Sequence, residues 1–303
     1  MIVVFMYLIM SNKMNALNAL ILIPAVFALF AGFTDVGDMI ISGAETVAST
    51  AIMVTFAILY FGTLIDAGMF DPLVNKVIKI SKGDPLKITV GTAILSLLVG
   101  LDGDGTITYL IVVTAFLPLY ERLGMNKLIL ACLPAMSMGI MNVLPWGGPT
   151  ARVMSVFNYD AMTVLTPLIP SIIAAALYVV GLGVFFGLKE RKRLGIQRIS
   201  VNHEVEDEMA ATVTVSAESL KRPKLFWFNL FTTALLVLGL LTAVLPLPAL
   251  FMLGYVIVTI VNYPNLGDQK ARIEAHAGNV LTVVSLIFAG GAFAGILEGT
   301  GMV

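Results

Sequence analysis

The sequence predicts an all-α, polytopic membrane protein, from its hydropathy, its scarcity of charge and its recurring apolar runs. Of the 303 residues, 58% are hydrophobic and 12% are charged, and the mean hydropathy is +0.96. A soluble globular domain has about 25% charged residues, so this composition excludes one. Each apolar run ends at charges or turn residues and is close to the roughly 20 residues that a helix needs to cross the hydrocarbon.

The same composition excludes several other classes of protein. The net charge of -1 gives no sign of nucleic-acid binding. Cys132 is the single cysteine and lies in an apolar run, so neither a disulfide framework nor a cysteine metal site is expected. His203 and His276 lie outside the apolar runs and are assigned no metal, and no resident cofactor is expected. Lys13 follows the first run, where a signal peptide would have small residues.

Eight apolar stretches are predicted to span the membrane. They are 1–10, 15–33, 48–68, 126–141 with a continuation to 158, 161–187, 225–245, 246–262 and 278–300. Residues 86–121 are a separate case, because Asp102 and Asp104 divide this apolar segment into two arms that are each short for a full crossing. A re-entrant hairpin that enters and leaves on one side fits this pattern best. Two short or tilted spans are the alternative.

The basic residues predict the orientation. If the loop 188–224 is cytoplasmic, alternating the spans places 17 of the 18 Lys and Arg residues on the cytoplasmic side. The segment 34–47 then lies outside and carries acidic residues only. Arg152 is the one basic residue that breaks the pattern. The predicted location is the bacterial cytoplasmic membrane.

Two segments of the chain resemble each other. Residues 36–69 share their Gly-Asp, Phe-Ala and Gly-rich motifs with residues 266–302, at an offset of about 231. The first Gly-Asp lies outside and the second inside, so the copies have opposite orientation, which is typical of secondary transporters. Chance similarity between two Gly- and Ala-rich helices is the alternative.

The repeat predicts three parts. These are a first repeat over 1–187, with the hairpin 86–121 and a broken helix over 126–158, then a cytoplasmic linker over 188–224, and the start of a second repeat over 225–303. The counterparts of the hairpin tip and of the broken helix would fall near 333 and 377. The second repeat is therefore expected to be incomplete here, and an inactive fragment or half-transporter is one alternative.

The hairpin tip is a candidate cation or proton site. Carboxylates within an apolar run are costly unless paired, protonated or metal-bound, and Gly103 and Gly105 allow the backbone to turn toward a ligand. Asp102 and Asp104 are the candidate metal or proton ligands, with Thr106 beside them. The alternative is a polar turn in which both carboxylates cap helix ends.

The second candidate feature is the interruption between Asn142 and Arg152. Pro145, Gly147, Gly148 and Pro149 cannot continue a helix, so a second half-helix is expected to begin near Thr150. A helix N-terminus attracts anions, and Arg152 adds a planar cation suited to a carboxylate. The alternative is an arginine that snorkels to the outer interface, with Trp146 as an interfacial anchor. The predicted substrate-binding residues are Asn142, Pro145, Trp146, Gly147, Gly148, Thr150, Arg152, Gly103, Gly105 and Thr106.

Two further carboxylates, Asp66 and Asp71, are expected to cap a helix end or to form a cytoplasmic-side pair rather than to bind a ligand. Together with Asp104, Asp66 raises a second class of function, an intramembrane aspartyl hydrolase, which needs two carboxylates that face each other. No partner for such a pair is compelling in the sequence, so the chain is not expected to be an enzyme.

The motifs of this chain resemble the CitMHS family, bacterial symporters of citrate-divalent metal complexes with protons. The resemblance rests on ungapped segments that occur in order along the whole chain: Val36–Gly43, Lys82–Lys87, Leu101–Thr106, Met141–Gly148, Lys221–Lys224 and Val261–Asn265. It implies an inverted-repeat fold of the ion transporter superfamily, with a hairpin and a broken helix in each half. It also implies a homodimer in the lipid bilayer that transports citrate with Mg²⁺ or Ca²⁺ as part of the substrate, coupled to protons.

Overall fold

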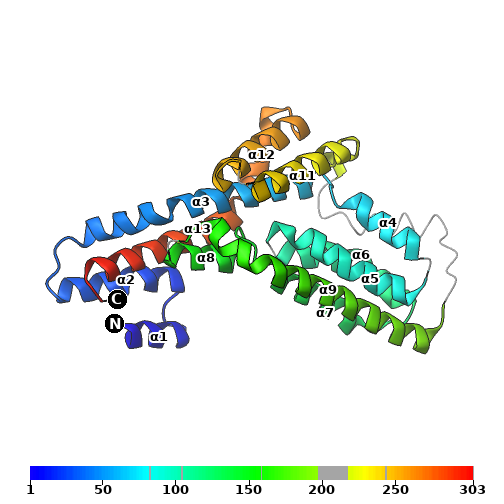
Figure 1. Cartoon of the computed structure of the whole chain (residues 1–303), viewed down its shortest axis with the longest axis horizontal. Helices are drawn as coiled ribbons and strands as arrows, with labels where there is room; N and C mark the ends of the chain where they lie inside the picture. Colours follow the sequence, from blue (N-terminus) through cyan, green and yellow to red (C-terminus); the bar gives the residue numbers. More distant parts are fainter. Residues whose placement is uncertain (82, 104, 158, 197–217, 243, 303) are drawn as a thin grey trace.

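The computed structural model describes residues 1–303 except 82, 104, 158, 197–217, 243 and 303. The regular structure of the described part is helical, which confirms the all-α prediction. The molecule is elongated, and both termini lie at the same end (Figure 1). Lys82, Asp104 and His203 lie outside the described residues.

Helices form at almost every predicted apolar run. Their bounds are α1 Ile2–Met10, α2 Ala16–Phe30, α3 Val36–Asp66, α4 Asp71–Ser81, α5 Pro85–Val99, η1 Gly100–Asp102, α6 Gly105–Arg122, α7 Lys127–Met141, α8 Gly148–Phe157, α9 Ala161–Leu194, η2 Glu218–Leu220, η3 Pro223–Leu225, α11 Phe226–Thr242, α12 Leu247–Asn262 and α13 Leu266–Gly299. Among the described residues, α3, α9 and α13 are long and apolar enough to cross a membrane by length and composition. The helices α2, α5, α7 and α12 are shorter and also apolar.

Three helices extend beyond their predicted bounds. The helices α3 and α13 each begin twelve residues before the predicted spans, at Val36 and Leu266, and so include Asp38 and Glu45 in α3. Hydropathy marks where a helix meets apolar surroundings, whereas a helix continues through polar residues when its backbone bonds remain intact. The helix α9 likewise extends to Leu194, so the first residues of the predicted linker are helical.

The two copies of the repeat pack against each other as antiparallel helices. Gly43 of α3 lies against the backbone of Gly291 in α13, and Gly62 lies against the ring of His276. Adding the offset of about 231 to Gly43 gives a position within two residues of His276. Subtracting it from Gly291 gives a position within two residues of Gly62. The same helix contact therefore occurs twice, with the roles of α3 and α13 exchanged. This is expected for copies of opposite orientation.

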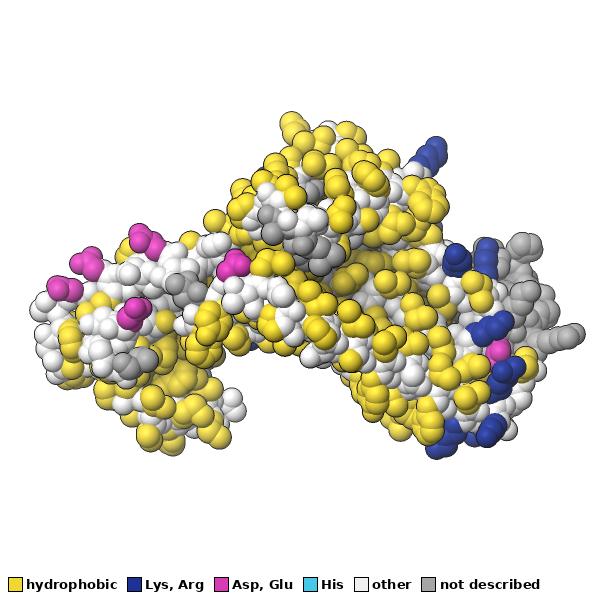
Figure 2. Space-filling model, viewed as in Figure 1, with side chains coloured by type: hydrophobic (Ala, Val, Ile, Leu, Met, Phe, Trp, Pro, Cys, Tyr) yellow, Lys and Arg dark blue, Asp and Glu magenta, His cyan; other side chains and the backbone are white. Residues whose placement is uncertain are grey.

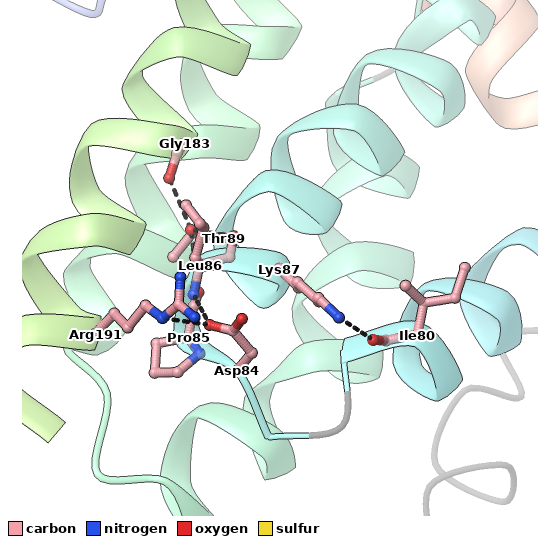
Figure 3. Close-up of polar contacts among 8 residues, drawn as sticks. All are labelled: Ile80, Asp84, Pro85, Leu86, Lys87, Thr89, Gly183 and Arg191. Carbon is pink, nitrogen blue, oxygen red and sulfur yellow. Dashed lines mark hydrogen bonds and ion pairs between the residues drawn. The ribbon is translucent and has the colours of Figure 1, made fainter. Parts of the chain in front are cut away.

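The hairpin α5–α6 is attached at its base to the last turns of α9. The Asp84 carboxylate caps α5 by accepting a bond from the Leu86 amide (3.1 Å), and it faces Arg191 at 3.6 Å. One turn further, the Thr89 hydroxyl donates to the Gly183 carbonyl (2.7 Å), where the two backbones approach closely (Figure 3). These contacts fix the entry of the hairpin.

The exit of the hairpin is held by the same end of α9. Glu190, whose side chain is 6% exposed, accepts a bond from the Asn126 amide (3.0 Å) and pairs with Arg193 (2.5 Å). Arg193 also donates to the Gly124 carbonyl (2.8 Å). The start of α5 and the connection after α6 are thus both held at the C-terminal end of α9. At a rise of about 1.5 Å per residue, the 15 residues of α5 carry the tip about 22 Å away from that end.

Charged side chains are segregated along the molecule. On the face that Figure 2 shows, acidic side chains gather near the end where α3 begins, and Lys and Arg gather at the opposite end, where the hairpin and α9 have their bases. The surface between the two ends is largely apolar (Figure 2). On this face, acidic and basic side chains are therefore concentrated at opposite ends of the molecule.

Candidate functional site

The tip of the hairpin is a short irregular turn. The helix α5 ends at Val99, and the 3-10 turn η1 continues to Asp102. Gly103 then has φ 76°, a left-handed conformation that favours glycine. At the start of α6, a Cβ on Gly105 would collide with the Met138 side chain of α7. The backbone conformation therefore requires glycine at 103, whereas the neighbour of Gly105 is the flexible end of the Met138 side chain.

The break in the second candidate helix lies between α7 and α8. The helix α7 ends at Met141 with Asn142 as its C-cap, and α8 begins at Gly148, two residues before the predicted start. The turn is closed by the Gly147 amide, which donates to the Leu144 carbonyl (2.8 Å), and by the Thr150 hydroxyl, which donates to the Asn142 carbonyl (3.1 Å). A side chain on Gly147 would collide with that same Asn142 carbonyl.

The structure brings these two interruptions into contact. The Trp146 indole N–H donates to the Leu101 carbonyl (2.8 Å), so the break is bonded directly to the turn before the tip. A Cβ on Gly103 would lie 3.3 Å from Gly147 Cα, which shows how closely the two backbones approach. Segments about 45 residues apart in sequence therefore form one site.

Trp146 is a core residue of this site. Its side chain is 5% exposed and packs against Phe251 and Phe61, with ring centroids 5.2 and 6.0 Å away. The alternative role as an interfacial anchor is wrong, because an anchor needs its polar edge at the headgroups, whereas this indole bonds to a backbone carbonyl inside the protein.

Arg152 lies in the second turn of α8 and is exposed. One of its terminal nitrogens lies 4.0 Å from the position that a Cβ on Gly148 would take, so the guanidinium folds back toward the N-terminus of α8. Within the described part of the chain, its side chain makes neither a hydrogen bond nor an ion pair. The positive end of the α8 dipole and an unpaired guanidinium thus face the same region, beside the break.

The two aspartates of the tip were predicted as metal or proton ligands. The backbone of Asp102 ends η1, and Asp104 lies outside the described residues. The described side chains include no group of three or more His, Cys, Asp or Glu residues that could hold a metal ion. The assignment to Asp102 and Asp104 stays a prediction.

A polar cluster at the junction of the two repeats was missed by the sequence analysis. The Asp66 carboxylate at the end of α3 accepts bonds from Arg272 (2.8 Å) and pairs with His276 (2.9 Å), both from α13. Asp71 pairs with Lys221 (2.7 Å). Each carboxylate therefore lies at a helix end and pairs with a basic partner from the second repeat or the linker, not with the other carboxylate. Extending the predicted helix from 278 back to 266 would have placed Arg272 and His276 one turn apart on it.

Comparison with known proteins identifies the relatives of this chain. The CitMHS family, described as "Citrate transporter", matches residues 2–303. A "Citrate transporter" of Bacillus subtilis (strain 168) is 54% identical over 304 residues, which cover all of this chain and 70% of that protein. A "Mg(2+)/citrate complex secondary transporter" of the same organism is 50% identical over 305 residues, with the same coverage. No solved structure matches the chain.

Proposed function

Because the chain belongs to the CitMHS family of citrate transporters, we propose that it imports citrate as a complex with a divalent metal ion, Mg²⁺ or Ca²⁺, by symport with protons. Membership of this family makes the chain a membrane transport protein and not an enzyme. The hydrolase alternative is thereby removed. A relative that is named for a Mg²⁺/citrate complex supports the metal-bound form of the substrate.

The observation that carries the proposal is the contact between the hairpin tip and the helix break. It brings the glycine backbone of the tip, the N-terminus of α8 and Arg152 around one region. Amide groups at a helix N-terminus and a guanidinium both favour carboxylates. In this proposal the carboxylates of citrate bind to Arg152 and the first amides of α8, and Asp102 or Asp104 binds the metal ion or the coupled proton.

Electrostatics favours the complex over free citrate as the transported species. Citrate is close to a trianion at neutral pH, and moving one negative charge inward costs about 2.3 kcal/mol per 100 mV of inside-negative potential. A divalent cation lowers the net charge of the complex to about -1. Protons that enter with the complex make net import neutral or favourable.

The proposed topology follows the charge segregation. The basic end and the 188–224 linker face the cytoplasm, and the acidic end, where α3 begins, faces outward. Residues 1–187 form the first repeat and residues 225–303 the start of the second. Two such chains form the homodimer in the cytoplasmic membrane.

Counterflow of labelled citrate tests the substrate. Purified protein in proteoliposomes loaded with citrate and Mg²⁺ should accumulate labelled citrate, and Ca²⁺ measured side by side should differ in rate. Removing divalent cations with EDTA should abolish the accumulation, because in this proposal the site binds citrate only as its metal complex. Equal counterflow with and without divalent metal would contradict transport of the complex.

Substitutions at the tip test the metal and proton assignment. Asp102→Asn and Asp104→Asn should each change the ratio of Mg²⁺- to Ca²⁺-supported uptake or the pH dependence of uptake, because either change removes one acceptor charge. Asp160→Asn is the matched control, since Asp160 caps α9 through the Met162 amide (3.0 Å). If both variants keep the metal ratio and the pH profile unchanged, the tip is structural.

A further inference from the structure

The junction of the two repeats contains a partly buried imidazole whose role the substrate site does not explain. His276 and Arg272 of α13 bind the same oxygen of Asp66, and each of the three side chains is 12–13% exposed. The ring of His276 lies directly over Gly62, where a Cβ would be 2.6–2.7 Å from its atoms. Glycine at 62 is what makes room for an imidazole between the two helices.

The internal repeat shows that the helix crossing itself does not need this cluster. At the offset of about 231 residues, Ile41 and Glu45 occupy the positions of Arg272 and His276, and Glu298 corresponds to Asp66. At that end α3 and α13 meet through Gly43, Gly291 and Gly295. Within the described residues, neither Glu45 nor Glu298 makes an ion pair. The same packing is thus achieved once with a charged cluster and once without, so the cluster has a purpose beyond packing.

The bonding pattern leaves one nitrogen of His276 to accept a proton. Arg272 keeps the Asp66 carboxylate ionised, and an ionised carboxylate only accepts hydrogen bonds. His276 Nε2 therefore carries the hydrogen that is directed at Asp66 (2.9 Å), and the lone pair of the neutral ring is on Nδ1. A proton that arrives adds to Nδ1 and forms an imidazolium, which the same carboxylate stabilises. A proton that departs leaves from the same atom.

The charged and titratable groups around His276 come from α3, from α13 itself and from the connection before α13. The α3 helix contributes Asp66, and α13 itself contributes Arg272. The Tyr263 ring, in the connection before α13, lies 5.8 Å from the Arg272 guanidinium and 5.0 Å from that of Arg222. Burial, with the nearby charge of Asp66, raises the pKa of Tyr263 to about 12, so this hydroxyl stays protonated and donates to the Leu220 carbonyl (3.0 Å).

We propose that His276, held by Asp66 and Arg272 between α3 and α13, is a binding site for the transported proton, at the end of α3 that leads to the basic face of the protein. This inference rests on the proton symport proposed above. In this proposal the proton binds at the junction between the repeats, and the metal-citrate complex binds at the hairpin tip and the helix break. Protonation of His276 adds one positive charge between α3 and α13. Proton binding therefore changes the electrostatic interaction between these two helices.

The test separates net uptake driven by a proton gradient from citrate exchange. Proteoliposomes with the wild-type protein should show Mg-citrate uptake that an inward proton gradient stimulates. His276→Gln keeps an N–H donor for Asp66 but cannot take up a proton, so the stimulation should fall by at least about tenfold while counterflow stays within about twofold of wild type. His203→Gln, the change at the only other histidine of the sequence, should keep both activities.

Three results would overturn the assignment. Normal stimulation in His276→Gln would show that the proton binds elsewhere, and loss of counterflow together with stimulation would make His276 a structural residue. If wild-type protein catalyses counterflow without responding to the proton gradient, proton symport itself fails while citrate transport stands. The double variant Asp66→Asn with Arg272→Gln removes the ion pair without leaving a single buried charge, and it should reproduce the loss of stimulation.

Discussion

Replacing Arg152 by alanine is expected to reduce citrate uptake by on the order of 100-fold while the protein still inserts and folds. Removing one member of a binding charge pair costs about 2–5 kcal/mol, and about 2.7 kcal/mol corresponds to a factor of 100. The fold should tolerate the change, because the Arg152 side chain is exposed and unpaired within the described residues. The measurement is the initial rate of Mg-citrate uptake in proteoliposomes, with circular dichroism as the check on folding.

Two variants sharpen this test. Arg152→Lys keeps the charge but loses the planar fork that binds a carboxylate through two parallel bonds, so an intermediate rate is expected. Lys189→Ala removes an exposed cation from α9, away from the site, and should leave uptake unchanged. Wild-type uptake by Arg152→Ala would remove the anion site from α8 and favour the snorkelling alternative.

The sequence was most informative where chain-breaking residues interrupt apolar runs. Gly103 at the tip needs a left-handed residue, and at Gly147 in the break the backbone of Asn142 leaves no room for a side chain. Such requirements are local, so they are visible in the sequence. The contact between tip and break, made by the Trp146 to Leu101 bond, joins two such local features across about 45 residues.

Features that depend on long-range packing were harder to predict. The extra twelve residues at the start of α3 and of α13 are polar enough to resemble loops, yet each segment continues its helix against the other copy. His276 was placed outside the spans for the same reason, and so its bond to Asp66, 210 residues away, was missed. A pairing over such a distance depends on how two helices cross, which one periodic pattern does not contain.

Replacing Trp146 by alanine is expected to destabilise the protein by about 3–5 kcal/mol, the usual cost of removing a buried aromatic side chain, and to abolish uptake. The indole fills the space between Phe61 and Phe251 and bonds the break to the tip. Loss of the ring removes both the packing and the direct link, so the two halves of the site are no longer held together. Thermal unfolding in detergent measures the first effect, and counterflow measures the second.

Trp146→Phe separates the two contributions. A phenyl ring keeps most of the aromatic packing but has no N–H for the Leu101 carbonyl, and one hydrogen bond contributes about 0.5–1.5 kcal/mol to stability. The variant should therefore unfold near the wild-type temperature and still transport several-fold more slowly, because the tip is no longer bonded to the break. Wild-type rates in Trp146→Phe would mean that packing alone aligns the two interruptions. Wild-type rates in Trp146→Ala would mean that the site does not depend on their contact at all.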